Sequence, residues 1–401
     1  MTPTHDARVR RRHVLYLPGF DPAGVRRYRD TYVREGARQA GISGYALEVA
    51  DLPEGNGPGW RVTAQIDGAK VETVVSYLDW SDIVKARLRR PLGESLTGCA
   101  RAFLIYMRSG AFFGIARVRR AFLIPLLGPY LLVFLVAPLL GLLVAALAGL
   151  LVPSWIALAA GIAAAAGFVA FLRARDRRFY VFYLMHVFSL IAERGGATPD
   201  LLRPVQAGFA ARIREALAGD FDEVLVVGHS AGGHMAVSVV AEVLRGGHGH
   251  DGRLALLTVG AVVPLPCLLA GGAEMRADVA ECARAEALFW LDVGAPGDGV
   301  CMALCDPVAM IGLDLPERRN PLVISAAFHR TLDPGTVNAP GFTFFRRHFQ
   351  YLCAFDRPGV YDYFRITAGP ERLADRFHGQ AHSPSRVITR ISRYSDIGEN
   401  A

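Results

Sequence analysis

The sequence predicts an α/β protein in which a mostly parallel sheet is flanked by helices and interrupted by a transmembrane hairpin of two helices. Two observations lead to this class. In the second half of the chain, short continuous apolar runs alternate with helical patterns, which is typical of strands covered on both faces of a parallel sheet. In the middle of the chain, the 52 residues from Ala121 to Leu172 include no Asp, Glu, Lys or Arg.

The composition narrows the class of protein. Of the 401 residues, 52% are hydrophobic and 20% are charged, which excludes a disordered chain because so apolar a sequence forms a core. The net charge is +7, and all basic residues except Lys70 and Lys85 are arginines. No stripe of basic and aromatic residues accompanies this charge, so we expect membrane lipids rather than nucleic acid as partners.

The six cysteines are scattered and lie mostly in apolar surroundings. Cys301 and Cys305 are four residues apart, but no second Cys or His pair completes a zinc site. We therefore expect buried free thiols, which suit a reducing compartment. Neither a metal nor a diffusible cofactor is expected.

The charge-free run is too long for one helix. At 1.5 Å per residue it would extend roughly 78 Å, whereas the hydrocarbon core of a bilayer is about 30 Å thick. We therefore expect two spans, about Leu126–Leu150 and Trp155–Leu172, with a break at Pro153, which cannot continue a helix. Alanine- and glycine-rich stretches in both spans would allow close packing. The alternative is a helical hairpin buried in a soluble core.

Both outer flanks of the hairpin are basic, whereas its turn carries no charge. The flanking arginines are Arg117, Arg119, Arg120, Arg173, Arg175, Arg177 and Arg178. By the positive-inside rule, both termini and the rest of the chain then face the cytoplasm, as in a multi-pass protein of the inner (cytoplasmic) membrane. The hairpin segment 117–178 would divide one soluble domain into residues 1–116 and 179–380, and a polar peripheral tail would follow at 381–401.

The soluble part shows a regular order of elements. Before the hairpin we expect strands at His13–Leu17, Trp60–Ile66 and Val71–Leu78, the last two joined by the turn Asp67-Gly68, and a helix at Val25–Ala40. After the hairpin we expect helices at Phe179–Glu193, from Thr198, at Ala231–Leu244 and at Ala273–Ala287. The strands expected there are Val224–Val227, Leu254–Val263, Leu288–Val293 and Pro321–Phe328.

One motif carries the candidate chemistry. The segment Gly228–Gly232 (GHSAG) reads G-x-S-x-G, directly follows an expected strand and opens an expected helix. A nucleophile elbow needs these glycines because the turn is strained and neighbouring backbone crowds the serine. Free N–H groups at the helix start also favour developing negative charge. The alternative is a turn of a nucleotide-binding fold, although this loop has no lysine and no G-x-G-x-x-G.

With this motif, the chain resembles the α/β-hydrolase superfamily of serine esterases and lipases over most of its length outside the hairpin. The resemblance implies an α/β-hydrolase-like sheet with Ser230 as the nucleophile, and with Gly228, His229 and Gly232 as parts of the elbow. It also implies an oxyanion hole formed by two backbone amides. One belongs to Ala231, the residue after the nucleophile.

The second amide would come from the loop after an early strand, Leu17–Asp21, and is assigned to Phe20. A simple turn at the strand exit is the alternative. His229 and His234 flank the elbow and are expected to support the site or contact the substrate, because a residue beside the nucleophile on the same turn cannot reach the hydroxyl from the proper side.

The order of the catalytic residues in that family, serine then acid then histidine, implies the other two. The acid follows the second strand beyond the elbow, which indicates Asp298, with Asp306 and Asp292 as alternatives. The histidine lies in a loop beyond the last strand, which favours His348 over His329. The acid would hold the histidine tautomer and stabilise the imidazolium.

The sequence thus favours a membrane-anchored serine hydrolase that cleaves an ester or thioester through an acyl-enzyme on Ser230. Lipophilic esters, acyl lipids among them, are the expected substrates because the hairpin would hold the domain at the membrane. Two alternatives stay open. One is a non-catalytic membrane adaptor on a hydrolase scaffold, and the other is an acyltransferase that uses the same triad.

Overall fold

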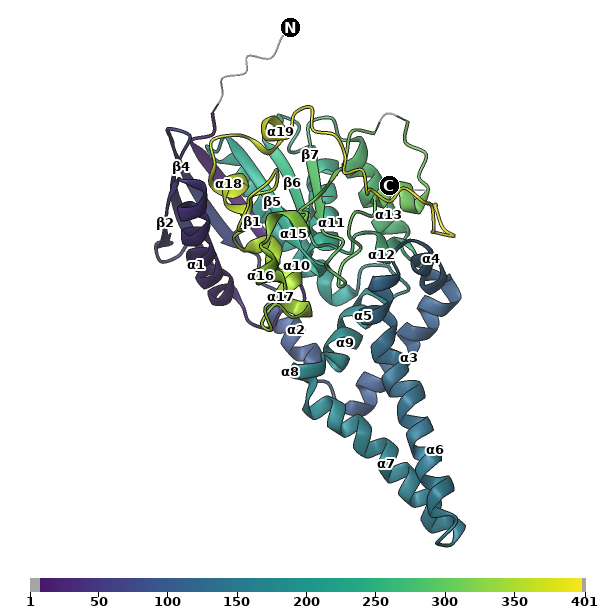
Figure 1. The fold of residues 1–401 in the computed structure, drawn as a ribbon. Helices are drawn as coiled ribbons and strands as arrows, with labels where there is room; N and C mark the ends of the chain where they lie inside the picture. Colours follow the sequence, from purple (N-terminus) through teal and green to yellow (C-terminus); the bar gives the residue numbers. More distant parts are fainter. Residues whose placement is uncertain (1–7, 317, 399–401) are drawn as a thin grey trace.

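The computed structural model describes residues 8–316 and 318–398 and shows an α/β fold built on an eight-stranded sheet (Figure 1). The strands lie in the order β2-β3-β4-β1-β5-β6-β7-β8. Their bounds are β1 Arg11–Leu17, β2 Ala46–Asp51, β3 Gly59–Ile66, β4 Ala69–Tyr77, β5 Glu223–His229, β6 Leu254–Val259, β7 Phe289–Gly294 and β8 Leu322–Ser325. Strands β2, β3 and β4 pair antiparallel, and all other pairings are parallel. The predicted class, a mostly parallel sheet flanked by helices, is confirmed.

The helices divide into two groups along the chain. Those before β5 are α1 Val25–Ser43, α2 Ser81–Leu88, α3 Leu92–Ser109, α4 Ala111–Val118, α5 Arg120–Leu131, α6 Ala137–Ala148, α7 Ser154–Ala174, α8 Asp176–Phe179, α9 Val181–Ala192 and α10 Arg203–Ala218. Those after β5 are α11 Ala231–Arg245, α12 Pro264–Cys267, α13 Ala273–Arg284, α14 Pro307–Ile311, α15 Phe328–Thr331, α16 Pro334–Val337, α17 Phe344–Phe349, α18 Tyr363–Ala368 and α19 Leu373–Arg376. Short π- or 3-10-helical segments are η1 Leu132–Val136, η2 Asp200–Leu202 and η3 Gln350–Leu352.

The central strand β5 shows why the sheet forms where the sequence is continuously apolar. Every residue of β5 is buried. Val224 and Val226 belong to the core on one face of the sheet, and Leu225 and Val227 belong to the core on the other face. Successive side chains of a strand point to opposite faces, so an uninterrupted apolar run fits a strand that is covered on both sides.

Two predicted strands are shorter in the structure. The strand expected at Leu254–Val263 is wrong beyond Val259, because Gly260 takes a left-handed φ of +54° and turns the chain out of the sheet. The strand expected at Pro321–Phe328 is limited to β8, and Phe328 starts α15 instead. In both places the apolar run continues past the strand because the following turn is also buried.

Some elements in the first half of the chain were not predicted from the sequence. Strand β2 is one, and it lies at the sheet edge, where it pairs only with β3 and stays partly exposed. Its side chains therefore lack a clear apolar pattern. Helices α2, α3 and α4 were also not predicted.

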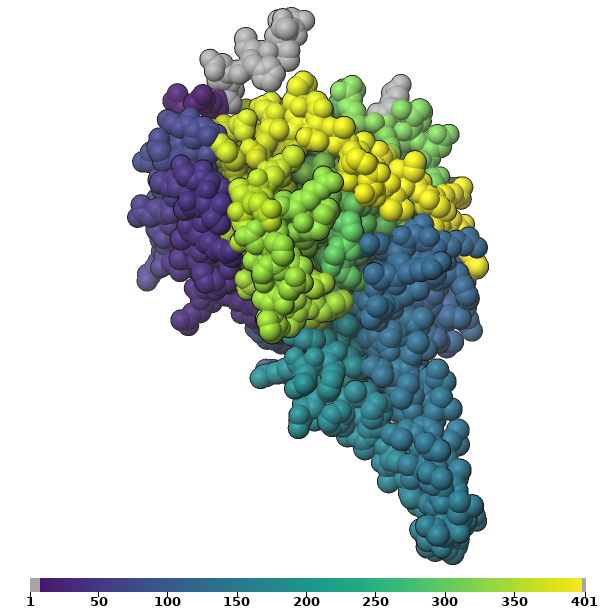
Figure 2. Space-filling view, viewed as in Figure 1, coloured from purple at the N-terminus to yellow at the C-terminus, as the bar shows by residue number. Residues whose placement is uncertain are grey.

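The apolar segment forms two antiparallel helices that project from one end of the body (Figures 1 and 2). The first helix is continuous over Arg120–Ala148 and the second is α7, so the predicted break around Pro153 is confirmed. The helices pack closely at Gly141 and Gly161. A Cβ atom added to Gly161 would lie 2.5 Å from the carbonyl oxygen of Gly141, so this contact needs small residues.

Both helices are long and apolar enough to cross a membrane, and only 17% of the most apolar window of each is buried. The alternative of a hairpin buried in a soluble core is therefore wrong. The first helix begins at Arg120 rather than near Leu126, since its first three turns pack against the body through side chains such as Phe122. Only the part beyond these turns projects.

The tail after Gln380 runs over the surface but is held at several points. Val387 forms an isolated bridge with Cys305, and Arg386 pairs with the buried Asp306 at 2.7 Å. Farther along, Asp396 accepts a 2.8 Å hydrogen bond from the fully buried Arg276. The described part of the tail, 381–398, is thus tied to β7–α14 and to α13.

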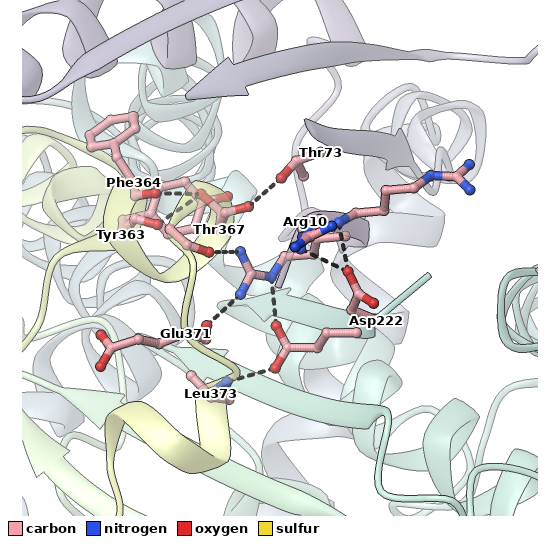
Figure 3. A network of polar contacts seen from close by, with 12 residues as sticks. Arg10, Thr73, Asp222, Tyr363, Phe364, Thr367, Glu371 and Leu373 are labelled. Carbon is pink, nitrogen blue, oxygen red and sulfur yellow. Dashed lines mark hydrogen bonds and ion pairs between the residues drawn. The ribbon is translucent and has the colours of Figure 1, made fainter. Parts of the chain in front are cut away.

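A buried ion pair joins the two central strands, β1 and β5, where each begins. Figure 3 shows the polar contacts around it, with Glu371 and Leu373 among the labelled residues. Arg12 of β1 and Glu223 of β5 are 0% and 2% exposed, and their side chains are 2.5 Å apart. The Arg12 guanidinium also donates to the carbonyl oxygens of Gly369 and Glu371, and Glu223 accepts from the Leu373 amide at 2.6 Å. Both charges are therefore satisfied, and the C-terminal segment is fastened to the start of β1 and β5.

Replacing Glu223 with Gln should destabilise the fold, because Arg12 would remain buried without its counter-charge. Loss of one partner of a buried ion pair costs about 3–5 kcal/mol of unfolding free energy. Thermal or chemical unfolding in detergent would measure this. The matched control is Asp220→Asn at the neighbouring exposed pair with Arg11, which should change the midpoint little. Equal midpoints for the two variants would contradict the prediction.

Candidate active site

The segment Gly228–Gly232 forms a strained turn between β5 and α11. Ser230 has φ 56° and ψ −125°, an unfavourable conformation for a residue with a side chain. The glycines are required by contact distances: a Cβ on Gly228 would lie 2.7 Å from the Ala236 side chain, and one on Gly232 would lie 2.4 Å from the Pro18 carbonyl oxygen. This is the geometry that the motif predicts for a nucleophile elbow.

The loop after β1 lies directly against the elbow. A Cβ on Gly19 would come within 2.9 Å of the Ser230 Cβ, so only glycine allows this approach. Within the described part of the chain, neither the Phe20 amide nor the Ala231 amide donates to any acceptor. Both residues line the same cavity as Ser230. These two predicted donors are thus free to receive an oxyanion.

Two aromatic side chains hold the Phe20 loop. Trp80 donates its indole N–H to the Pro18 carbonyl at 3.0 Å, and the Tyr183 hydroxyl donates to the Phe20 carbonyl. The carbonyls are therefore occupied, which fixes the peptide planes of the loop. Neither residue could be predicted from the sequence, because Tyr183 comes from α9 and Trp80 from the segment before α2.

The structure brings Asp298 and His348 together. Asp298 Oδ2 lies 2.8 Å from His348 Nδ1, and both side chains are buried. Asp298 also accepts from the Val300 amide at 2.9 Å and from the Tyr351 hydroxyl at 3.2 Å. Burial alone would raise the pKa of Asp298, but the facing His348, the Cys301 thiol and the Val300 amide lower it below its ordinary value. Asp298 is thus suited to remain ionised beside the histidine.

The other ring nitrogen of His348 is open to the cavity. Nε2 is buried and has no hydrogen-bond partner within residues 8–316 and 318–398. His348 and Ser230 line the same narrow cavity, which has a volume of about 30 Å³. His348 lies on the short helix α17 rather than in a loop, because an aromatic-rich turn continues into η3 there.

The alternative acids and the alternative base lie elsewhere or have other roles. Asp306 is paired with Arg318 and Arg386 and caps α14 by accepting from the Ala309 amide. Asp292 accepts from the Thr258 hydroxyl, and burial raises its pKa to about 7.

The alternative base is excluded by its position. His329 is exposed on α15, on the outer surface. It neither lines the cavity nor contacts Asp298, so of the two candidate histidines only His348 is placed beside a buried carboxylate.

The two histidines that flank the elbow have different surroundings. His229 Nε2 lies 3.1 Å from the His348 carbonyl oxygen, and the two rings are 4.9 Å apart. His229 therefore supports the backbone that carries His348. His234 lines a separate cavity with Ser238 and Met275, away from Ser230. Burial lowers the pKa of His229 to about 3 and that of His234 to about 4, so both are neutral at pH 7.

Arg119, in the basic segment before the hairpin, contacts the loop that carries Asp298. Arg119 donates to the carbonyl oxygens of Pro296 and Asp298 at 3.1 and 3.0 Å. Helix α9, which follows the hairpin, covers the cavity with Leu184, Val187 and Phe188. The helices next to the projecting hairpin thus form the roof of the candidate active site.

The six cysteines are all free and buried, which confirms the expectation of buried free thiols. Residues 8–316 and 318–398 contain no group of three or more His, Cys, Asp or Glu side chains that could hold a metal ion.

In comparisons with known proteins, no family model, no curated protein and no solved structure matches the chain.

Replacing Asp298 with Asn should abolish most of any esterase activity, because the amide cannot hold His348 in the required tautomer. A loss of about 10⁴-fold in kcat is expected, measured with a chromogenic ester. Asp306→Asn should instead lower the unfolding midpoint, and His329→Ala should match the wild type. Full activity of Asp298→Asn would rule out its role as the acid.

His229 should make stability depend on pH. Its pKa in the folded chain is about 3, so below about pH 6.5 the unfolded chain binds a proton that the folded chain does not. The wild type should therefore lose unfolding free energy relative to His229→Gln by about 1.4 kcal/mol per pH unit as the pH falls from 6 to 4.5. The comparison with the variant removes the opposite contribution of Asp292. A constant difference between the two proteins would refute this.

Proposed function

We propose that the protein is a membrane-anchored serine hydrolase of the α/β-hydrolase type that cleaves esters or thioesters. The observation that carries the proposal is the convergence of four separate parts of the chain. The strained Ser230, His348 and the residues with free amides, Phe20 and Ala231, line one cavity, and Asp298 is paired with His348 behind it. These are the groups that acyl transfer uses, and a hydrogen bond between Ser230 and His348 Nε2 would have to form when the substrate binds.

The first half of the reaction follows from these positions. The Ser230 hydroxyl attacks the carbonyl carbon of the substrate while His348 Nε2 accepts the hydroxyl proton, and Asp298 stabilises the resulting imidazolium. The carbonyl oxygen becomes an oxyanion that the two free amides stabilise. When the bond from the carbonyl carbon to the leaving oxygen or sulfur breaks, His348 returns the proton to the leaving group. An acyl ester of Ser230 remains.

In the second half of the reaction, a water molecule attacks the acyl-enzyme and Ser230 becomes the leaving group. His348 removes a proton from a water molecule that attacks the acyl carbon. The bond from that carbon to Ser230 Oγ then breaks, Ser230 regains its proton from His348, and the carboxylic acid leaves. An alcohol in place of water would make the same residues an acyltransferase.

The length and the exposed apolar surface of the hairpin support the proposal that the protein is anchored in a membrane. The second helix has 21 residues, which at 1.5 Å per residue is about 30 Å, the thickness of the hydrocarbon core. The large exposed side chains of the hairpin include Leu142, Leu150, Trp155 and Ile162. By the positive-inside rule, the arginines at both ends of the segment favour a soluble domain on the cytoplasmic side.

The wild-type protein in membranes should react with a fluorophosphonate probe, and Ser230→Ala should lose both labelling and about 10³-fold or more of the esterase activity. Ser238→Ala is the matched control, because Ser238 lies on the same helix but outside the Ser230 cavity. It should label as the wild type does. A folded wild type that neither labels nor hydrolyses any ester would favour the non-catalytic adaptor instead.

A further inference from the structure

Two larger cavities open next to the candidate active site, on the side of the hairpin. The first, which we name the apolar groove, is lined mostly by apolar residues, among them Ile124, Gly128, Leu184, Phe344 and Phe345, and also by Arg177 and Arg178. The second, which we name the arginine cavity, is lined by Arg27, Arg173 and Arg177 together with Asp21 and Asp176. Their volumes are about 500 and 510 Å³, within the usual range of ligand-binding pockets.

The three cavities meet at one side chain. Phe345 of α17 is the residue that lines the catalytic cavity, the apolar groove and the arginine cavity alike. Its ring lies 3.9 Å from that of Tyr180 and 5.4 Å from that of Tyr183, measured between centroids. Because Phe345 lies one helical turn before His348, the junction is built into the helix that carries the candidate base.

Helix α9 separates the two paths from the catalytic cavity. Leu184 lines the catalytic cavity and the apolar groove, whereas its neighbour Tyr183 lines the catalytic cavity and the arginine cavity. Successive residues of a helix point about 100° apart. A molecule bound at Ser230 can therefore extend in two directions, one apolar and one charged.

The apolar groove lies at the base of the projecting hairpin. Ile124 and Gly128 belong to α5, and the same helix continues into the exposed apolar part beyond Leu132. Ile124 is 71% exposed, and Phe344 and Phe179 are also exposed there. Figure 2 shows the segment near residue 345 (yellow-green) lying just above the teal helices that project. An acyl chain could thus pass from a bilayer into the groove without crossing water.

The arginine cavity has unneutralised positive charge. Arg27 is paired with Asp21 at 3.0 Å, and Asp176 is occupied by the amides of Phe182 and Tyr183 at the start of α9. Arg173 makes no ion pair within the described residues. Its Nη2 donates to the Arg90 carbonyl oxygen at 2.8 Å, whereas its Nη1 is buried without a partner.

The positive charge around the arginine cavity also lowers the pKa of a neighbouring histidine. Burial, followed by the charges of Arg87, Arg90 and Arg173, lowers the pKa of His186 at this cavity to about 4. A buried guanidinium nitrogen without an acceptor, in an electropositive cavity, is suited to an anionic group such as a phosphate.

We propose that the substrate is an anionic acyl lipid that binds from the bilayer, with its acyl chain in the apolar groove and its headgroup in the arginine cavity. This proposal rests on the proposed function, because it names the substrate of the same site. The scissile carbonyl then lies beneath Phe345, between Ser230 and the two free amides. The charged headgroup and the apolar acyl chain thus extend on opposite sides of α9, the headgroup into the arginine cavity and the acyl chain into the apolar groove.

The chain path is tested by filling the apolar groove. A Cβ on Gly128 meets no atom within 4 Å, so Gly128→Leu places a side chain in open space, and Gly128→Ala gives a graded step. The ratio of kcat/KM for a sixteen-carbon ester to that for a four-carbon ester should fall by about tenfold or more in Gly128→Leu, and less in Gly128→Ala. The matched control is Gly167→Leu in α7, where a Cβ also meets nothing; it should keep the wild-type ratio.

The headgroup position is tested with two matched arginines. Arg173 lies 5.8 Å over the Phe182 ring and lines the arginine cavity, whereas Arg175 lies 5.8 Å over the Phe171 ring and lines none of the three cavities. In mixed micelles, Arg173→Gln should raise KM for phosphatidylglycerol about fivefold with kcat and the KM for phosphatidylcholine little changed. Arg173→Lys should restore part of the loss, and Arg175→Gln should behave as the wild type.

The outcomes separate the two proposals. If the wild type labels on Ser230 and cleaves esters, but Gly128→Leu matches Gly167→Leu and Arg173→Gln matches Arg175→Gln, the lipid path is wrong and the hydrolase function stands. If no ester is cleaved and Ser230 is not labelled, both fail. Equal use of phosphatidylglycerol and phosphatidylcholine by the wild type would overturn the anionic headgroup.

Discussion

The close approach of two turns, at the ends of β1 and β5, is the constraint on which the candidate site depends. The strands pair in parallel with Leu17 beside Gly228, so the chain leaves both at the same edge of the sheet. There, the Pro18 carbonyl leaves no room for a Cβ at Gly232, and Ser230 leaves none at Gly19. The strain at Ser230 persists because the surrounding contacts define it. At the other end of the same strands, the buried pair of Arg12 and Glu223 holds their register.

The position of the hairpin connects the candidate site with the two helices that are long and apolar enough to cross a membrane. The chain leaves the sheet after β4 and returns at β5, and the segment between them is mostly helical and includes the projecting hairpin (Figure 1). The hairpin is therefore more than a tether in this architecture, since the helix after it roofs the cavity and Arg119 before it binds the carbonyl of Asp298. A lipid that enters at the base of the hairpin would meet the nucleophile directly.

Local patterns in the sequence were sufficient where one segment determines its own structure. The Asp67-Gly68 turn appears with φ of 51° and 74°, as expected for a two-residue hairpin. The strand pattern failed where contacts with other parts of the chain determine burial. Strand β2 is a partly exposed edge strand, and residues 260–263 are apolar because they are buried in the turn after β6. Trp80, Tyr183 and Tyr351 had no signal, because their hydrogen bonds join distant parts of the chain.

The sequence by itself determined the elbow, the central strands and the apolar hairpin, because glycine spacing, continuous apolar runs and missing charge act within a few residues of each other. It ranked Asp298 above Asp306 and Asp292, and His348 above His329, only through the residue order of a family that it resembles, because carboxylates of the same charge cannot be told apart by local pattern. Only the tertiary structure placed His348 at 2.8 Å from Asp298 and left His329 exposed. The same holds for the three joined cavities, because α5, α7, α9 and α17 line them from distant positions in the chain.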